Sequence, residues 1–400
     1  MINLMSDLKR VASALLAMRV CRLAIKLFTV FLIAGTGIGG NQSGVFQAFS
    51  QVGAPAGQGS DAKRTATNFE FQKLADGIYA VVRKDLPGFM VDANDVLIIN
   101  DNDVVVVDTN GAPAITREVL AELKKLTNKP VRYVINTHWH DDHIRGNDVY
   151  REAFPGVEFI AHAAMRDYMP GQGEINRRNF LEGAPRFLED LKRAVANGKS
   201  LTGSDITPEE RASHQSDIRL VELVLSEGSK APAILPTISV TERLTLHRGK
   251  RIIDIRYLGS GHTAGDLVIH LPHEGILITG DLVVWPVPLV GNPQSRIGDW
   301  ASTIEKLLAL RPTIIVPGHG PVMRDDSYLV LLAELFTSVK KQAAAAAARG
   351  ETLEEARKSI NLEEFRKRFS GDSKIRKLLF QAYVAGPAVE AAYREVTGKH

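Results

Sequence analysis

The chain has 400 residues, of which 44% are hydrophobic and 24% are charged. This composition is typical of a soluble globular protein and excludes disordered, collagen-like and polytopic membrane chains. The formal net charge is +3, and it becomes −1 once residues 1–50, with five Lys or Arg and one Asp, are left out. Residues 51–400 are so close to neutral that they offer no positive potential for binding a phosphate backbone, so we expect no nucleic-acid partner.

The first 50 residues have the order of an export signal. Basic residues extend to Lys26, an apolar run begins at Leu27, and a stretch rich in small residues follows, as in signal peptides. The apolar run of about 10 residues is too short to cross a bilayer, which takes about 20. We expect a signal peptide and leader over residues 1–50, a linker over 51–66, and a periplasmic or secreted product without stable membrane insertion. A disordered leader on a cytosolic protein is the alternative.

The single cysteine, Cys21, lies in this leading segment. The remainder of the chain therefore offers no disulfide, no thiolate metal ligand and no cysteine nucleophile. A body without cysteine is compatible with an oxidising compartment.

Strand and helix patterns alternate from residue 67 onward, beginning with β-rich runs that predict an antiparallel meander. The predicted strands are Phe69–Leu74, Gly77–Val82, Asp95–Ile99, Val104–Asp108, Val131–Thr137, Val157–Ala161, Ile238–Leu246, Arg251–Leu258, Asp266–Leu271, Gly275–Thr279 and Thr313–Val316. The predicted helices among them are Ala114–Leu126, Asn147–Phe154 and Ser302–Leu310. Two strand-rich halves that each end in helices predict an α/β (α+β) protein, built as a β-sandwich with helices on its outer faces.

Two helical segments stand apart from this alternation. Residues 170–236 are charged and helical in pattern, with Pro208 after Thr207 marking a helix start. We interpret this segment as an insertion. Residues 326–400 are helical in pattern, and we expect them to form a C-terminal extension. The sandwich domain is then assigned to residues 67–325.

The histidines carry the chemical signal. Directly after the predicted strand that ends at Thr137, the chain reads HWHDDH from His138 to His143. Side chains alternate in an extended segment, so His138, His140 and Asp142 can point to one side. His143 can swing toward them where the chain turns into a helix. Imidazole and carboxylate are the ligands of catalytic zinc, and the absence of cysteine argues against a closed structural zinc site.

Three more candidate ligands lie near the ends of later strands. His262 lies in a glycine-bracketed loop, Asp281 closes the strand Gly275–Thr279, and His319 follows the strand Thr313–Val316. Loops at strand ends are the usual places for sites. The glycines around His262 let the backbone approach a site closely.

With the four motifs HWHDDH, GHTAGD, TGD and PGHG, the chain resembles the metallo-β-lactamase-fold hydrolases from Phe69 to Arg324. The resemblance implies an αββα sandwich with a binuclear site along one edge and two Zn²⁺ per chain. The implied ligands of one ion are His138, His140 and His262, and those of the other are Asp142, His143 and His319. Asp281 and a hydroxide would bridge both ions. Asp142 would act in catalysis by orienting this nucleophile and moving its proton.

The resemblance predicts an exported zinc hydrolase that attacks a small-molecule carbonyl in a lactam, lactone, ester or thioester. Asp281 stands where many β-lactamases of the superfamily have cysteine, so the match to that branch is imperfect. An aspartate bridge is more similar to the thioesterase, lactonase and phosphodiesterase branches, but Val284 stands where lactonases have tyrosine. The alternatives are a phosphodiesterase, a mononuclear iron oxygenase or redox enzyme on the same fold, and a catalytically silent binding protein.

The remaining polar and aromatic candidates carry weaker signals. Asp108 and Asp266 are placed to accept the second N–H of a metal-bound imidazole, although Asp108 could equally be a turn or cap residue. Asp141 is expected to face solvent. The tryptophans Trp139, Trp285 and Trp300 are expected either to line a substrate pocket or to pack in the core. No role is assigned to His162, His214, His247, His270, His273 and His400, and no oligomeric state is predicted.

Overall fold

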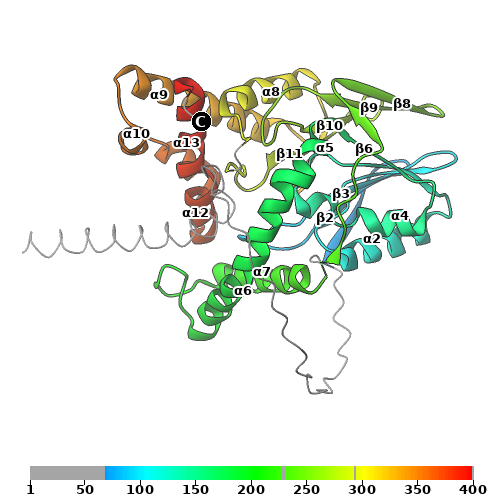
Figure 1. The fold of residues 1–400 in the computed structure, drawn as a ribbon, viewed down its shortest axis with the longest axis horizontal. Helices are drawn as coiled ribbons and strands as arrows, with labels where there is room; N and C mark the ends of the chain where they lie inside the picture. The colour runs from blue at the N-terminus through cyan, green and yellow to red at the C-terminus, as the bar shows by residue number, and fades with distance from the viewer. Residues whose placement is uncertain (1–67, 228–229, 292–293, 399–400) are drawn as a thin grey trace, which may run out of the picture.

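The computed structural model describes residues 68–227, 230–291 and 294–398. These residues form two β-sheets that pack face to face, with helices on the outer side of each (Figure 1). The predicted αββα sandwich is therefore confirmed. The predicted signal peptide, leader and linker over residues 1–66 lie outside the described residues, as do Cys21 and His400.

The first sheet has seven strands in the order β1-β2-β3-β4-β5-β6-β7. They are β1 (Phe69–Ala75), β2 (Ile78–Arg83), β3 (Asp95–Ile99), β4 (Val104–Val107), β5 (Val131–Ile135), β6 (Glu158–His162) and β7 (Ile238–Val240). The first four pair antiparallel, as the predicted meander requires. The last three are added in parallel, and parallel neighbours need crossover connections. The helices α2 (Pro113–Leu126), α3 (Asp141–Ile144) and α4 (Asn147–Ala153) lie in those crossovers.

The second sheet has five strands in the order β12-β11-β10-β9-β8. They are β8 (Arg243–Arg248), β9 (Arg251–Tyr257), β10 (Leu267–Leu271), β11 (Ile276–Val284) and β12 (Ile314–His319). All neighbours pair antiparallel except β11 and β12. Helix α8 (Ile297–Ala309) makes the crossover between these two parallel strands.

Strand β4 shows how the layers are held together. Val105 and Val107 lie in the apolar core between the two sheets, and Val104 and Val106 lie in the core between the first sheet and its helices. All four are buried, as expected where side chains alternate and both faces of a sheet are covered. Each buried valine stabilises the fold by about 1.5–3 kcal/mol relative to an exposed one.

Helix α5 (Met165–Tyr168) precedes the predicted insertion, which forms most of η1 (Met169–Gly173) and all of α6 (Glu174–Asn197) and α7 (Pro208–Ser226). The Thr207 side chain accepts a hydrogen bond from the Glu210 amide, and the Glu210 side chain accepts one from the Thr207 amide. This capping box fixes the start of α7 at Pro208, as predicted. Helices α6 and α7 pack side by side, in green in Figure 1.

The chain after the sandwich is helical, as predicted. It forms α9 (Ser327–Ala348), α10 (Leu353–Ser359), α11 (Glu363–Ser370), α12 (Lys374–Phe380), η3 (Gln381–Ala385) and α13 (Gly386–Thr397). With α8, most of these helices pack on the outer face of the second sheet through one apolar core. Trp300 is fully buried in that core, where its ring stacks on Phe336 with 4.5 Å between ring centroids.

Several predicted elements differ from the structure, and the strand predicted over Thr313–Val316 continues to His319, which therefore lies inside β12. The single strand predicted over Ile238–Leu246 is wrong, because the chain leaves the first sheet after Val240 and enters the second at Arg243. The helix predicted from Ser302 already begins at Ile297. The strand predicted to end at Thr279 continues to Val284, with its pairing to β12 shifted around Gly280.

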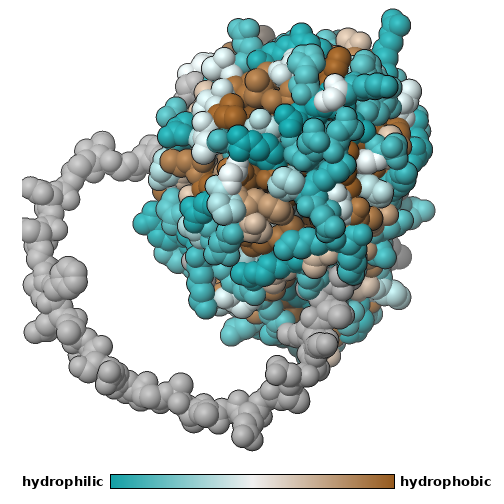
Figure 2. All heavy atoms as spheres, turned by 90° about the vertical axis from the view of Figure 1, so that its right-hand side faces the viewer, coloured by the Kyte–Doolittle hydropathy of each residue, from teal (hydrophilic) through white to brown (hydrophobic). Residues whose placement is uncertain are grey.

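The described residues contain no helix that is long and apolar enough to cross a membrane. Figure 2 shows one face of the molecule, where hydrophilic residues dominate and apolar ones are interspersed among them. Such scattered apolar residues are normal on a protein surface.

Candidate metal centre

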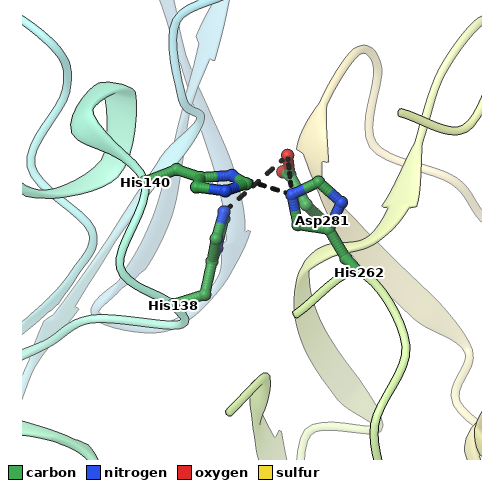
Figure 3. A group of neighbouring side chains, drawn as sticks. All are labelled: His138, His140, His262 and Asp281. Carbon is green, nitrogen blue, oxygen red and sulfur yellow. Dashed lines mark hydrogen bonds and ion pairs between the residues drawn. The ribbon is translucent and has the colours of Figure 1, made fainter. Parts of the chain in front are cut away.

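The structure brings all seven predicted ligands together at one edge of the sandwich. The HWHDDH segment follows β5 of the first sheet, whereas the other three ligands come from the second sheet and its loops. Their ligand atoms form two groups, and the atoms of each group lie within 4.8 Å of one another. One group is His138, His140, His262 and Asp281, and the other is Asp142, His143 and His319. Figure 3 shows the first group converging from the two sheets.

The Asp281 carboxylate lies between these two groups. Its Oδ1 is 3.2 Å from Nε2 of His143 and 3.2 Å from Nε2 of His319. Its Oδ2 is 3.5 Å from Nε2 of His262 and 3.9 Å from Nε2 of His138. One carboxylate oxygen therefore faces each group. Asp281 lies inside β11 and not in a loop after it, because that strand continues past the shift at Gly280.

The polar atoms at this centre fit a bound cation. Among the described residues, His138 Nε2 is buried and has no hydrogen-bond partner, and Asp281 Oδ1 faces two imidazole nitrogens at 3.2 Å. A buried polar atom without a partner costs about 1–3 kcal/mol, which coordination would offset. The donors are imidazole nitrogens and carboxylate oxygens, which suit Zn²⁺. A side chain at Gly318 would collide with Asp281 Oδ1, so the PGHG motif needs glycine before His319.

Three of the imidazoles are oriented by hydrogen bonds through Nδ1. His143 Nδ1 is 2.9 Å from Asp108 Oδ2, His319 Nδ1 donates to the Asp92 carbonyl at 2.9 Å, and His262 Nδ1 donates to the Leu289 carbonyl at 2.8 Å. In each ring Nε2 then faces the centre. Such partners fix the tautomer and the orientation of a metal-binding imidazole.

Asp108 supports an imidazole of the centre, which is one of the two roles predicted for it. Its carboxylate accepts hydrogen bonds from the Thr137 amide and hydroxyl, both at 2.8 Å, besides contacting His143. Its backbone φ of 60° is in the left-handed region, which Asp tolerates better than most residues. The turn after β4 therefore directs this side chain toward the centre.

The prediction that Asp266 supports an imidazole is wrong. Its carboxylate accepts hydrogen bonds from the Thr263 amide at 2.8 Å and the Thr263 hydroxyl at 2.6 Å. It therefore braces the loop that carries His262, while the Leu289 carbonyl holds the ring itself. Burial raises the pKa of Asp266 to about 7.

The electrostatics divide the histidines into two classes. Burial lowers the pKa of His138 and His262, and it lowers the pKa of His140 to about 3. Burial opposes protonation of His319 too, but the Asp281 and Asp142 carboxylates outweigh it and raise the pKa of His319 to about 10. The same carboxylates and Asp108 raise the pKa of His143 well above its usual value. Without a metal ion, the carboxylates therefore favour the protonated forms of His143 and His319.

The centre opens into a cavity of about 210 Å³. His140, Asp142, His262 and Asp281 line it on one side. Much of the remaining lining is apolar and includes Phe89, Met90, Phe180, Leu220, Leu289 and Tyr383. These side chains come from the loop after β2, the helical insertion, the loop after β11 and the C-terminal extension. The cavity is therefore built jointly by the sandwich and its two helical additions.

The tryptophans and Asp141 occupy different environments. Trp139 lines the cavity and its Nε1 donates to Gln294 Oε1 at 3.1 Å, whereas Trp300 is a core residue. Trp285 lies under the Arg376 guanidinium. Asp141 was expected to face solvent, and its side chain is 40% exposed. It also forms an ion pair with Arg145 at 2.6 Å and lines the cavity.

Sequence reasoning missed the carbonyls of Asp92 and Leu289 and the apolar cavity wall. A backbone carbonyl leaves no signal in residue type, because every residue has one. Phe89 and Tyr383 come from segments without a motif, and only the packing brings them to the cavity.

We predict that metal binding releases protons. His143 and His319 carry raised pKa values in the metal-free protein, and an imidazole must lose its proton to bind a metal. Metal affinity should accordingly fall as the pH falls below neutrality. Calorimetric titration of metal-free protein with Zn²⁺ in buffers of different ionisation enthalpy measures the protons released. Identical binding enthalpies in all buffers would contradict the prediction.

We predict that Asp108→Ala weakens metal binding about 10- to 100-fold, because supporting carboxylates contribute roughly that much to affinity. Competition with a chromophoric chelator measures the affinity. Asp76→Ala is the matched control, since the Asp76 side chain is fully exposed. Equal affinities of the two variants, with folding verified by circular dichroism, would show that Asp108 does not support the centre.

Comparisons with known proteins identify the family of this chain. The family model described as metallo-beta-lactamase superfamily matches residues 90–319. The linear primary-alkylsulfatase of Pseudomonas sp. (strain ATCC 19151) is 25% identical over 226 residues, which are 54% of this chain and 39% of that protein. The metallo-beta-lactamase type 2 of Bacteroides fragilis is 22% identical over 288 residues, which are 69% of this chain and 89% of that protein.

Among solved structures, a stereoselective inverting sec-alkylsulfatase from Pseudomonas sp. matches with a TM-score of 0.57 and 16% identity. The match covers 83% of this chain and 51% of that chain, so this chain spans about half or less of either alkylsulfatase. The family model matches more than half of this chain, from before β3 to the end of β12, and includes all seven candidate ligands. The chain therefore belongs to the metallo-beta-lactamase superfamily.

Proposed function

We propose that this protein is an exported hydrolase that binds two Zn²⁺ and cleaves a carbonyl bond in a small molecule, such as a lactam, lactone, ester or thioester. The observation that carries the proposal is the Asp281 carboxylate, whose two oxygens face two separate groups of ligand atoms. Two adjacent groups of ligands that share a carboxylate would suit a hydrolytic two-metal site. His138, His140 and His262 would hold one ion, and Asp142, His143 and His319 the other.

Zinc ions held there would lower the pKa of water and stabilise negative charge on the oxygen of the attacked carbonyl. The chain supplies the positioning. Asp142 lines the cavity, its side chain is 24% exposed, and its Oδ2 lies 3.2 Å from His319 Nε2. Its neighbours His143 and His319 outweigh the effect of burial and lower its pKa. The Asp142 carboxylate is therefore ionised at neutral pH, and it can orient a water molecule and accept its proton.

The cavity beside Asp142 suits a substrate with an apolar part. Apolar and aromatic side chains make up much of its lining, and its polar lining includes the metal centre together with Arg145, Asn176 and Arg177. Small-molecule sites commonly combine an apolar wall with a few converging polar groups. The apolar wall binds the body of the substrate, and the polar end holds the bond to be cleaved.

Hydrolysis of a sulfate ester is the second candidate. Its support is the similarity to the linear primary-alkylsulfatase, which extends over 54% of this chain. An apolar cavity next to a cationic centre would suit an alkyl sulfate as well as it suits a carbonyl ester. The two candidates share the centre and differ in the bond that is attacked.

We expect the purified protein to contain two Zn²⁺ per chain and to turn over at least one carbonyl substrate. The metal content is measured by mass spectrometry, and the activity with a panel of β-lactams, lactones, esters, thioesters, alkyl sulfates and phosphodiesters. Chelation should abolish turnover and Zn²⁺ should restore it. His140→Ala should abolish it as well, with His247→Ala as the control on the exposed side of β8.

The same measurements separate the alternatives. A measured content of one iron per chain would contradict the zinc hydrolase and indicate a mononuclear iron enzyme. Turnover of alkyl sulfates without any carbonyl substrate would favour the second candidate. A zinc-loaded protein without activity on the whole panel would contradict a hydrolase of these classes.

Export is supported by the sequence order of the first 50 residues. Expressed from Met1 in a Gram-negative host, the protein should appear in the periplasm without its signal segment. Cell fractionation and mass spectrometry of the N-terminus measure this. A variant that lacks residues 2–50 is the control and should remain in the cytoplasm. Full-length protein found only in the cytoplasm would contradict the proposal.

A further inference from the structure

The segment Pro87–Asp92, which we name the wall segment, connects the apolar side of the cavity with the metal centre. Phe89 and Met90 line the cavity. Two residues further along, the Asp92 carbonyl accepts the hydrogen bond from His319 Nδ1 at 2.9 Å. A shift of this segment would therefore move the surface against which substrate lies, and it would also disturb a ligand of the centre.

The insertion holds the wall segment from one side. Asp217 of α7 accepts hydrogen bonds from the Met90 amide through Oδ1 at 2.8 Å and from the Phe89 amide through Oδ2 at 3.2 Å. Ser213, one turn earlier, donates its hydroxyl to the Pro87 carbonyl at 2.8 Å. A side chain at Gly88 would collide with the Asp217 carboxylate. This close approach requires glycine in the wall segment.

The C-terminal extension holds the same segment from the other side. The Tyr383 hydroxyl of η3 donates to the Phe89 carbonyl at 2.8 Å, and Tyr383 is itself 9% exposed and lines the cavity. Phe89 is thus bound through its N–H by the insertion and through its carbonyl by the extension. Neither partner belongs to the sandwich that carries the metal ligands.

The Phe89 ring is also fixed. It packs edge-on against Phe187 of α6 and stacks on the His214 ring of α7, each with 6.3 Å between ring centroids. A loop side chain would otherwise sample several rotamers, and holding one rotamer gives the cavity a defined wall at Phe89. His214, for which the sequence offered no role, thus packs behind the wall segment.

We propose that the wall segment determines specificity, with Phe89 setting the length of the acyl chain that the cavity accepts, and that Asp217 and Tyr383 are positioning residues. The substrate class is a carbonyl ester or thioester with an unbranched apolar acyl chain. This inference rests on the proposed hydrolase function. Each methylene buried by the cavity contributes about 0.8 kcal/mol, which corresponds to an increase of about fourfold in kcat/KM per methylene until Phe89 is reached.

The experiment measures kcat and KM of the zinc-loaded full chain with p-nitrophenyl esters of increasing acyl length. The wild type should show a rise in kcat/KM of about fourfold per methylene, followed by a drop. Phe89→Ala should move that drop to longer chains. Phe365→Ala in α11, whose side chain does not line the cavity, should keep the wild-type profile.

The positioning residues are tested with conservative variants. Tyr383→Phe and Asp217→Asn should raise KM for the longest accepted ester about tenfold, and by more than they raise KM for the acetyl ester. Tyr393→Phe is the matched control, because the Tyr393 hydroxyl donates to the Glu351 carbonyl away from the cavity. A merely structural role would lower activity on all esters alike.

Direct binding keeps this inference separate from the hydrolase proposal. Calorimetric titration of the same variants with fatty acids of the same chain lengths needs no turnover. If nothing in the substrate panel is cleaved but affinity still depends on chain length and Phe89→Ala shifts the limit, the hydrolase proposal fails and the wall assignment is supported. If neither kcat/KM nor affinity changes with chain length, or if Phe89→Ala leaves both profiles unchanged, the wall assignment is overturned.

Discussion

The buried carboxylate of Asp281 is the constraint on which the arrangement of this protein depends. A carboxylate without a partner in the interior is very costly, and here its oxygens are surrounded by imidazoles from three separate segments. One segment follows the first sheet, and the other two belong to the second. The two sheets therefore have to keep a fixed position relative to each other, and the apolar core between them holds that position.

The supporting hydrogen bonds extend this constraint outward. His143 depends on Asp108 after β4, His262 on the Leu289 carbonyl after β11, and His319 on the Asp92 carbonyl before β3. Each supporting group lies in a different loop from the imidazole that it holds. The centre is thus a point where loops of both sheets brace one another, and the helical additions join this bracing through the wall segment.

Sequence patterns correctly predicted the strands and helices that depend only on neighbouring residues. The valines of β4 bury both faces, and the capping box at Thr207 starts α7 where Pro208 indicated. The strand predicted over Ile238–Leu246 failed because its apolar pattern continues across the point where the chain changes sheets. Asp281 was placed outside its strand for a related reason, since the pairing shift at Gly280 depends on β12.

The sequence by itself determined the family resemblance, the sandwich and the seven side chains that converge, because ligand chemistry and alternation are properties of residue type and spacing. Only the tertiary structure decided which group holds each imidazole, and that Asp266 braces a loop instead. Backbone carbonyls and apolar walls have no signature in the chain. They acquire a role when packing places Phe89, Asp217 and Tyr383, which are far apart in sequence, against one another.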